Sequence, residues 1–203
     1  EISQLGVSEI ELNARENAVP FYKAANYKLG EFSHLLFEEI PHYKMTKVLT
    51  KSQNKEGEAL TKIWHETIPL SAFMGIEVAS YNEQQLVVQA NVDVNKNLHN
   101  TMFAGSIYTL ATLTGWGWVY LKLQEEGLSG DIVLAQGNIR YLTPVDHKAI
   151  ACLTDKKTSG KLALLKKGRK ARVKVEVEIK EGDNTTAIFE GSYVVVPDTK
   201  RQN

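Results

Sequence analysis

The residues best suited to chemistry lie between Asn97 and Ser106, where the chain enters a long stretch without charged side chains. Asn97 can donate hydrogen bonds from its side-chain amide, and Thr101 and Ser106 supply hydroxyl groups. A helix that begins near Ala104 would leave the N–H groups of its first turn unpaired and partially positive. Such groups can bind a developing oxyanion. The stretch therefore predicts an oxyanion-binding site built from a helix start and neutral side chains.

The same stretch contains no carboxylate, because no Asp or Glu occurs from position 98 through 124. A reaction that needs a general base or a carboxylate nucleophile must take it from elsewhere. His99 is the tempting base, although a single loop histidine is more often solvated than catalytic. Asn97 also fits a turn residue or a helix cap, and Thr101 also fits a cap. Both structural alternatives remain open at this stage.

A second functional candidate is the basic run at positions 161–172, which contains Arg169, Lys170 and Arg172 and no acid. In its simplest interpretation, this run is a solvated surface that keeps the protein soluble. In the functional interpretation, it binds phosphate groups or the acidic surface of a partner. The functional interpretation is favoured.

Composition narrows the classes of function. Lys and Arg total 24, as do Asp and Glu, so the charge balance gives no support to nucleic-acid binding. One cysteine, Cys152, excludes a disulfide within the chain and favours a reducing, cytoplasmic compartment. Positions 98–121 are uncharged and long enough to span a bilayer, but they are too polar and lack a basic flank. We expect a helix buried inside protein, with no membrane partner. Because residue 1 is Glu rather than Met, we also expect a longer parent protein.

Hydrophobic periodicity places these residues in an α+β domain. A polar segment at 51–58 predicts a linker between residues 1–50 and a domain over 59–197. A single helix that is apolar nearly all round needs cover on most sides, which one curved antiparallel sheet can provide. The expected elements after the linker are a helix at 61–74 interrupted at Pro69, strands at 76–81 and 86–94, the long helix at 104–126, and strands at 132–142, 149–154, 171–179 and 186–196.

The first fifty residues predict a smaller unit. A strand at 9–12, a helix at 14–25 capped by Asn13, and strands at 28–36 and 43–49 are expected. This is too little chain to build a sizeable core of its own.

Three separated motifs give the chain a family resemblance: Asn-Leu-His-Asn-Thr-Met-Phe-Ala-Gly-Ser at 97–106, Ile-Arg-Tyr-Leu-Thr-Pro-Val at 139–145, and Gly-Arg-Lys-Ala-Arg at 168–172. They resemble the hotdog-fold thioesterase superfamily, and more closely the C-terminal domain of YiiD-type bifunctional proteins. The resemblance covers about residues 59–197 and implies a hotdog fold. Positions 12–22 are similar to the last third of a GNAT acetyltransferase, in which the tyrosine matching Tyr22 often protonates the departing thiolate. The upstream coenzyme-binding strand and its glycine-rich loop are missing, so a docking remnant is expected.

The resemblance also implies acyl-thioester chemistry. Many hotdog thioesterases carry His-Gly-Gly at the helix start and a carboxylate nearby. In this sequence, Phe103-Ala104-Gly105 stands where His-Gly-Gly would be. Thr112 stands where one common subfamily has its helical carboxylate. Some members of the YiiD-like group are described as malonyl-[acyl carrier protein] decarboxylases that supply acetyl-carrier protein for fatty-acid synthesis. The missing carboxylate agrees with decarboxylation, which requires no general base and no metal. Asn97 would then bind the thioester oxygen, and Thr101 would orient the carboxylate.

Two alternatives remain beside decarboxylation. A hydrolytic thioesterase would take its base from His99, Asp93 or a partner subunit, and a non-catalytic module would only bind acyl-CoA. In each case the resemblance places the basic run near the pantetheine tunnel. Arg169, Lys170 and Arg172 would then contact coenzyme A, phosphopantetheine or an acidic acyl carrier protein. No cofactor is required beyond the coenzyme A or phosphopantetheine of the substrate. A homodimer or higher homo-oligomer is expected, because hotdog sites are usually built between subunits.

Overall fold

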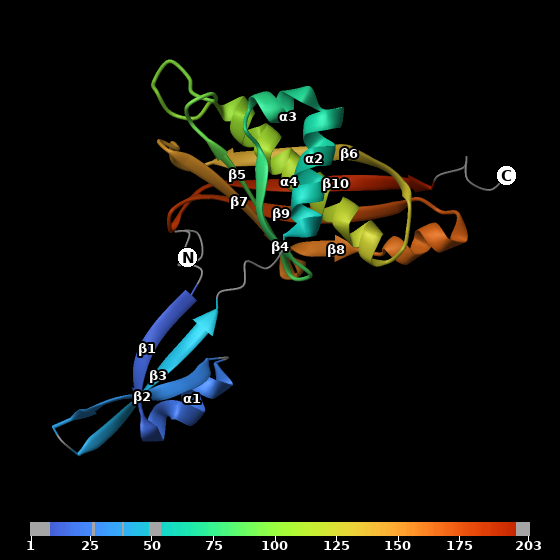
Figure 1. The fold of residues 1–203 in the computed structure, drawn as a ribbon. Coiled ribbons are helices and arrows are strands. Elements are labelled where there is room, and N and C mark those ends of the chain that lie inside the picture. The colour runs from blue at the N-terminus through green and yellow to red at the C-terminus, as the bar shows by residue number, and fades with distance from the viewer. Residues whose placement is uncertain (1–8, 26, 38, 49–53, 198–203) are drawn as a thin grey trace. The chain divides into compact units, whose positions relative to one another are not determined.

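The computed structural model describes residues 9–25, 27–37, 39–48 and 54–197. The chain forms two compact units, Glu1–Gln53 and Asn54–Asn203 (Figure 1). Each unit has its own core.

The first unit is a small antiparallel sheet with one short helix. Its elements are β1 (Glu9–Arg15), the 3-10 turn η2 (Glu16–Ala18), α1 (Val19–Ala24), β2 (Lys28–Leu36) and β3 (Ile40–Val48), with strand order β1-β3-β2. The predicted helix start at residue 14 and the Asn13 cap are wrong. Asn13 and Ala14 lie inside β1, opposite Lys44 and Tyr43 of β3. Pairing with β3 overrides the local helix preference, and Pro20 marks the true first turn.

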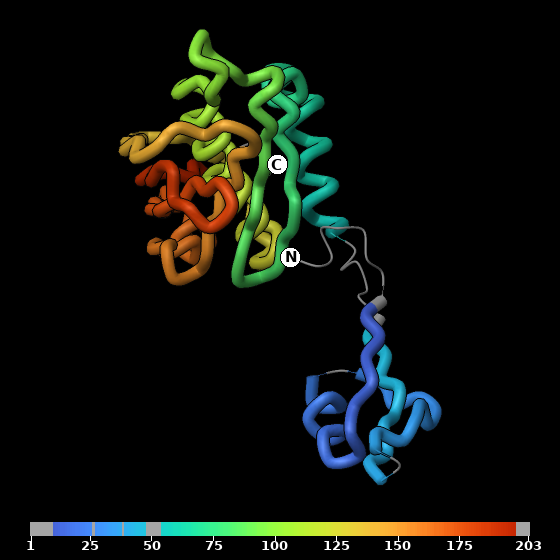
Figure 2. The backbone as a smooth tube through the Cα atoms, turned by 90° about the vertical axis from the view of Figure 1, so that its left-hand side faces the viewer, coloured from blue at the N-terminus to red at the C-terminus, as the bar shows by residue number. Residues whose placement is uncertain are grey.

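The second unit wraps one sheet around one long helix. The sheet order is β4-β5-β7-β9-β10-β6, and β8 pairs with β9. Figure 2 shows α2 running alongside β4. The elements are α2 (Lys55–Thr67), α3 (Pro69–Phe73), β4 (Glu77–Asn82), β5 (Gln85–Asn91), α4 (Ala104–Glu125), β6 (Gly130–Tyr141), β7 (Lys148–Thr154), η3 (Asp155–Lys157), β8 (Thr158–Gly160), η4 (Leu162–Lys167), β9 (Ala171–Glu181) and β10 (Asn184–Pro197).

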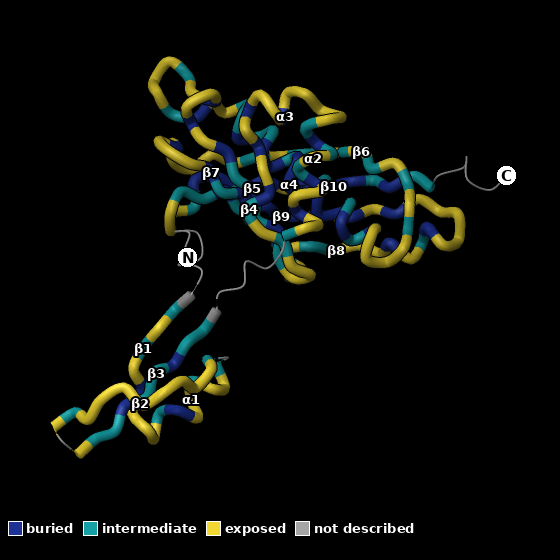
Figure 3. Tube along the Cα trace, in the orientation of Figure 1, coloured by how far each residue is buried: buried dark blue, intermediate teal, exposed yellow. Residues whose placement is uncertain are grey.

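Helix α4 lies in the core of this unit, as its apolar composition predicts (Figure 3). Two glycines allow its neighbours to approach closely. A Cβ on Gly115 would lie 2.5 Å from the Tyr193 hydroxyl of β10, and one on Gly117 would lie 2.5 Å from the Trp64 ring of α2. The helix therefore packs against the sheet on one side and α2 on another. Among the described residues, no helix combines the length and apolarity needed to cross a membrane.

The boundaries on either side of α2 correct two expectations. Residues 55–58 are helical, so the predicted linker overlaps the first turn of α2, and Gly57 is buried there. Residues 51–53 lie outside the described part of the chain. The predicted helix at 61–74 is two helices, because Pro69 begins α3, and Gly75 ends it at a positive φ of 62°.

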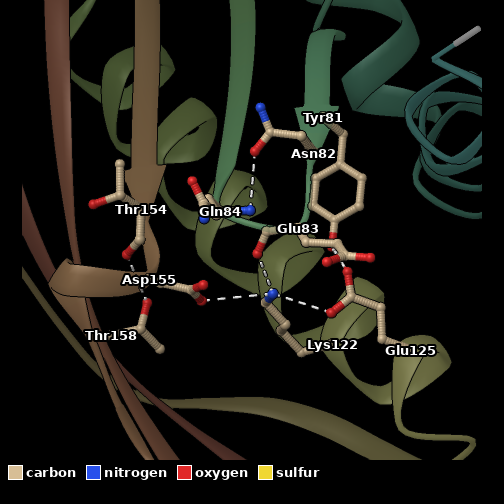
Figure 4. Close-up of polar contacts among 9 residues, drawn as sticks. All are labelled: Tyr81, Asn82, Glu83, Gln84, Lys122, Glu125, Thr154, Asp155 and Thr158. Atoms are coloured by element: carbon tan, nitrogen blue, oxygen red, sulfur yellow. Dashed lines mark hydrogen bonds and ion pairs between the residues drawn. The ribbon is translucent and has the colours of Figure 1, made fainter. Parts of the chain in front are cut away.

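The C-terminal end of α4 is fixed by a charged cluster (Figure 4). Lys122 donates to the Glu83 carbonyl and to Glu125 Oε2, the latter at 3.0 Å, and it lies 3.5 Å from Asp155 Oδ1. The Tyr81 hydroxyl donates to the other oxygen of Glu125. Burial, and then the contact with Glu125, raise the pKa of Tyr81. The cluster joins α4, the β4–β5 turn and the end of β7.

Candidate active site

The loop between β5 and α4 is anchored at both ends. The buried Asn95 amide donates to the carbonyls of Met74 and Asn91, each at 2.8 Å. Phe103 N–H donates to the Asn95 carbonyl at 2.7 Å, and Met102 N–H donates to the Val145 carbonyl at 2.8 Å. The loop thus enters α4 from a fixed position.

Inside this loop, the Asn97 side chain bonds to its own neighbours. Its Oδ1 accepts from His99 N–H at 2.8 Å and Thr101 N–H at 3.3 Å, and its Nδ2 donates to Thr101 Oγ1 at 3.0 Å. Asn100 takes the left-handed conformation, with φ of 60°. Asn97 therefore has the loop-closing role of a turn residue, and one of its amide protons has no acceptor in the described part of the chain.

Thr101 is not a helix cap. Phe103 directly precedes α4, and no side-chain hydrogen bond caps the helix. Within the described chain, the Thr101 hydroxyl accepts from Asn97 but donates to no partner. Its proton therefore remains available next to the spare proton of Asn97.

The first turn of α4 presents two unpaired amides. Ser106 N–H and Ile107 N–H both donate to the Phe103 carbonyl, at 2.9 and 3.1 Å. The N–H groups of Ala104 and Gly105 have no acceptor among residues 9–25, 27–37, 39–48 and 54–197. The predicted oxyanion-binding site over residues 104–106 therefore has two available N–H donors, because the Ser106 N–H is already bonded to the Phe103 carbonyl.

One residue at this site had no role assigned from the sequence. Tyr141, at the end of β6, donates from its hydroxyl to the Ala104 carbonyl at 2.8 Å. Burial, and then the nearby Tyr108, raise the pKa of Tyr141. The motif at 139–145 marks the segment but gives no local sign of this contact, which joins residues 37 positions apart.

The expected acid–base groups make no contact here. The His99 ring is exposed and has no hydrogen-bond partner in the described part of the chain. Thr112, where the resemblance to one hotdog subfamily predicts a helical carboxylate, has a buried hydroxyl without a described partner, and its carbonyl accepts from the Tyr193 hydroxyl at 2.8 Å. In the described part of the chain, residues 97–106 form no hydrogen bond with a carboxylate. Nor do the described residues contain a group of three side chains that could hold a metal ion.

The basic run lies at the other end of the sheet. β9 begins at Ala171, opposite Val195, whereas Ile179 pairs with Ala187, which in turn pairs with Tyr141 beside the α4 start. Eight strand residues span about 26 Å. A single chain therefore does not bring the exposed Arg169, Lys170 and Arg172 to the loop at 97–106, and their expected contact with the pantetheine group stays a prediction.

A polar groove extends the basic run across the outer face of the sheet. It has a volume of about 530 Å³. Arg172 Nη1 donates to Ser192 Oγ at 2.8 Å, and Ser192 lines the groove. Its charged lining residues are Lys156, Lys157, Lys174, Glu176 and Glu190. Lys157 forms an ion pair with Glu176 of the same lining, so the cations that can receive anionic groups here are Lys156, Lys174 and those of the basic run.

Comparisons with known proteins bear on the second unit. A family model described as "Putative thioesterase (yiiD_Cterm)" matches residues 57–197. The structure of a "putative thioesterase" from Shewanella oneidensis is 45% identical, with 71% of this chain and 100% of that chain covered and a TM-score of 0.67. A protein of unknown function from Chlorobaculum tepidum is 30% identical, with coverage of 70% and 94% and a TM-score of 0.62.

A more distant structure shows the shared fold alone. A thioesterase from Haemophilus influenzae is 19% identical, with 72% of this chain and 94% of that chain covered and a TM-score of 0.57. Together with the long helix and antiparallel sheet, these matches confirm the hotdog fold of the second unit. The acetyltransferase-like interpretation of residues 1–50 stays a prediction.

Proposed function

The chain belongs to the thioesterase family of the YiiD C-terminal domain, an enzyme family, and on that premise we propose that it decarboxylates malonyl thioesters to acetyl thioesters. One observation carries the proposal. The start of α4 has two amides without a partner in the described chain, and the loop that leads into it carries the spare protons of Asn97 and Thr101 and forms no hydrogen bond to a carboxylate. This set of groups can stabilise an oxyanion but cannot activate water.

The proposed reaction breaks the bond between the malonyl carboxylate carbon and C2. The electron pair moves through C2 to the thioester oxygen as CO₂ leaves, and the resulting enolate takes a proton from solvent at C2. The N–H groups of Ala104 and Gly105, with the Asn97 amide, stabilise the negative oxygen. The Thr101 hydroxyl donates to the carboxylate and holds it out of the thioester plane. No base or metal takes part in these steps.

Exposed apolar side chains around this site favour loss of the carboxylate. Leu98 is 86% exposed and Phe103 is 56% exposed. Over a bound thioester, they would exclude water from the carboxylate, which is a charged group that is costly to desolvate. As CO₂ leaves, the charge moves from the carboxylate to the thioester oxygen, which the α4 amides stabilise, so desolvation of the carboxylate favours the reaction.

Hydrolysis is the second candidate, because the 45% identical Shewanella protein is called a "putative thioesterase". It would require a base from outside the helix start. His99 and Asp93 are both exposed, and neither side chain has a partner in the described part of the chain. Hydrolysis would therefore take its base from a bound partner subunit or from a residue that substrate binding brings into place.

A homodimer that pairs through β6 would bring the basic surface of one chain close to the α4 start of the other. β6 is a long edge strand, and unpaired edges of this kind invite pairing. The strand register against β10 shifts at Ala135, so Asp131 and Arg140 are exposed on the same face. Neither residue forms an ion pair within the described chain.

A twofold, antiparallel pairing centred on β6 would place Asp131 opposite Arg140 of the partner subunit, and the reverse. It would also place the basic run of the partner subunit and this chain's loop at 97–106 at the same end of the joined sheet. The thioester group would then bind at one chain's α4, while the phosphates or the acidic carrier protein contact the other chain's basic surface.

The pairing is tested by charge reversal. Asp131→Arg places like charges opposite each other and weakens the dimer, whereas the double variant Asp131→Arg, Arg140→Asp restores it. Light scattering across a dilution series measures both. A monomeric wild type, or a double variant no better than the single one, contradicts the pairing.

The reaction is tested with purified protein, malonyl-carrier protein and malonyl-CoA. Mass spectrometry should find the acetyl thioester and released CO₂, with little free thiol. Free malonate with thiol release would instead establish hydrolysis, and binding without either product would establish a non-catalytic module. Asn97→Asp keeps an acceptor for the loop but removes the amide donor, so it should lower kcat by about tenfold to a hundredfold.

A further inference from the structure

The contact between Tyr141 and α4 reaches the proposed oxyanion site through a single peptide group. Tyr141 donates to the carbonyl of Ala104 at 2.8 Å. That carbonyl and the N–H of Gly105 belong to the same peptide unit. The N–H of Gly105 is one of the two amides that have no acceptor in the described chain. The tyrosine and the free donor therefore lie at opposite ends of one polarisable group.

A hydrogen bond to a carbonyl polarises its peptide and makes the attached N–H a stronger donor. We propose that Tyr141 is a positioning residue that strengthens and orients the Gly105 N–H toward the substrate oxygen. The inference rests on the proposed function, because it requires a thioester oxygen at the start of α4. Tyr141 itself contacts the helix and not the reacting atoms.

The surroundings of Tyr141 suit this role. Like any phenol, the Tyr141 hydroxyl keeps its proton at neutral pH and can donate, and burial and the neighbouring Tyr108 raise its pKa further. Gly105 also lacks a Cβ, which would lie 2.3 Å from Cε1 of Phe103. The absence of a side chain at this position thus allows the Phe103 ring to lie against the Gly105 backbone.

The chain contains a matched control on the same helix. The Tyr193 hydroxyl donates to the Thr112 carbonyl, also at 2.8 Å. The peptide that joins Thr112 to Leu113 lies in the interior of α4, where its N–H is used in the helix. Tyr193→Phe therefore removes the same kind of bond without affecting a free donor.

The experiment compares Tyr141→Phe and Tyr193→Phe in the full chain, with malonyl-carrier protein as substrate. Removing a complete oxyanion donor costs about 100-fold or more in kcat, so weakening one should cost about tenfold. We expect Tyr141→Phe to lose about tenfold in kcat with KM nearly unchanged, and Tyr193→Phe to keep its kcat even where its Tm falls. Equal losses in both variants, or an unchanged kcat in Tyr141→Phe, would overturn the inference.

A second readout does not depend on turnover. In protein labelled with ¹⁵N-glycine, the Gly105 amide resonance is assigned by its loss in Gly105→Ala. Its proton should shift upfield in Tyr141→Phe and stay in place in Tyr193→Phe, and an unmoved resonance in Tyr141→Phe overturns the inference. A wild-type enzyme that leaves malonyl thioesters intact would overturn the proposed function, and the Gly105 resonance would still decide whether Tyr141 polarises this peptide.

Discussion

The two ends of α4 differ in how their polar groups are paired. At the C-terminal end, Lys122 has three oxygen partners, on Glu83, Glu125 and Asp155. At the N-terminal end, the amides of Ala104 and Gly105 are unpaired within the described residues, and no charged side chain bonds to them.

This difference separates stability from chemistry along one helix. A paired charge cluster holds elements together, whereas amides without a partner at a helix start are free to bind a ligand. Changes at the N-terminal end should therefore affect catalysis most, and changes at the C-terminal end should affect folding most.

The largest effect is expected from removing one N-terminal amide. Gly105→Pro deletes the N–H at the second position of α4, a place where proline is tolerated, as Pro20 shows in α1. We expect kcat to fall about 100-fold with little change in Tm. Steady-state kinetics and thermal unfolding measure the two quantities.

Gly105→Ala is the control for that variant, because it meets the same Phe103 ring but keeps the N–H. It should lose much less activity than Gly105→Pro. An equal loss in both would mean that the added side chain, and not the missing amide, is responsible.

The next effect concerns the basic surface, which lies at the end of the sheet away from the 97–106 loop. Charge reversal of Arg169 and Arg172 to Glu should raise the KM for malonyl-carrier protein by about tenfold, while kcat stays within about twofold. The reason is that these side chains attract substrate but lie away from the α4 start. High salt should reduce the difference in KM from wild type. An unchanged KM in the variant would contradict binding of the carrier protein to the basic surface.

A smaller effect is expected at the charged cluster. Lys122→Met removes the shared cation from Glu125 and Asp155 but retains most of the side-chain length. It should lower the free energy of unfolding by about 1–2 kcal/mol, measured in urea, with kcat unchanged. Lys62→Met is the control, since its exposed pair with Glu66 at 3.7 Å should contribute less than about 0.5 kcal/mol.

The smallest effect is expected at His99. Because its ring is exposed and has no partner in the described chain, His99→Ala should leave kcat within about twofold of wild type. The measurement is the same product assay across pH 6 to 8. A large loss, with thiol as the main product, would favour hydrolysis with His99 as the base.

Local patterns were enough to predict the fold of the second unit. The helix predicted at 104–126 from the uncharged run at 98–121 matches α4 to within one residue, and the alternation of Val173, Val175 and Val177 predicts β9. The errors arose where tertiary contacts override local preference. Ala14 pairs in a sheet, and Gly57 is buried in α2. β8 and η4 were missed because Thr158–Gly160 is short and the lysines of 161–167 hide the buried Leu162 and Leu165.

The site was only partly predictable. Asn97 and Thr101 are four residues apart in one loop, so local sequence places them close together, and their side chains are hydrogen-bonded in the structure. The contact of Tyr141 with Ala104 and the distance of Arg169 from the loop depend on strand register across the sheet, which no local pattern encodes.

The hydrogen bonds that close the 97–101 loop have a consequence for substrate recognition. Asn97 and the left-handed Asn100 fix the backbone before any ligand arrives. Binding then freezes few main-chain torsions, so little conformational entropy opposes it. Differences in affinity between thioesters should accordingly reflect the acyl groups themselves, whereas a looser backbone, as in Asn100→Gly, should weaken all of them alike.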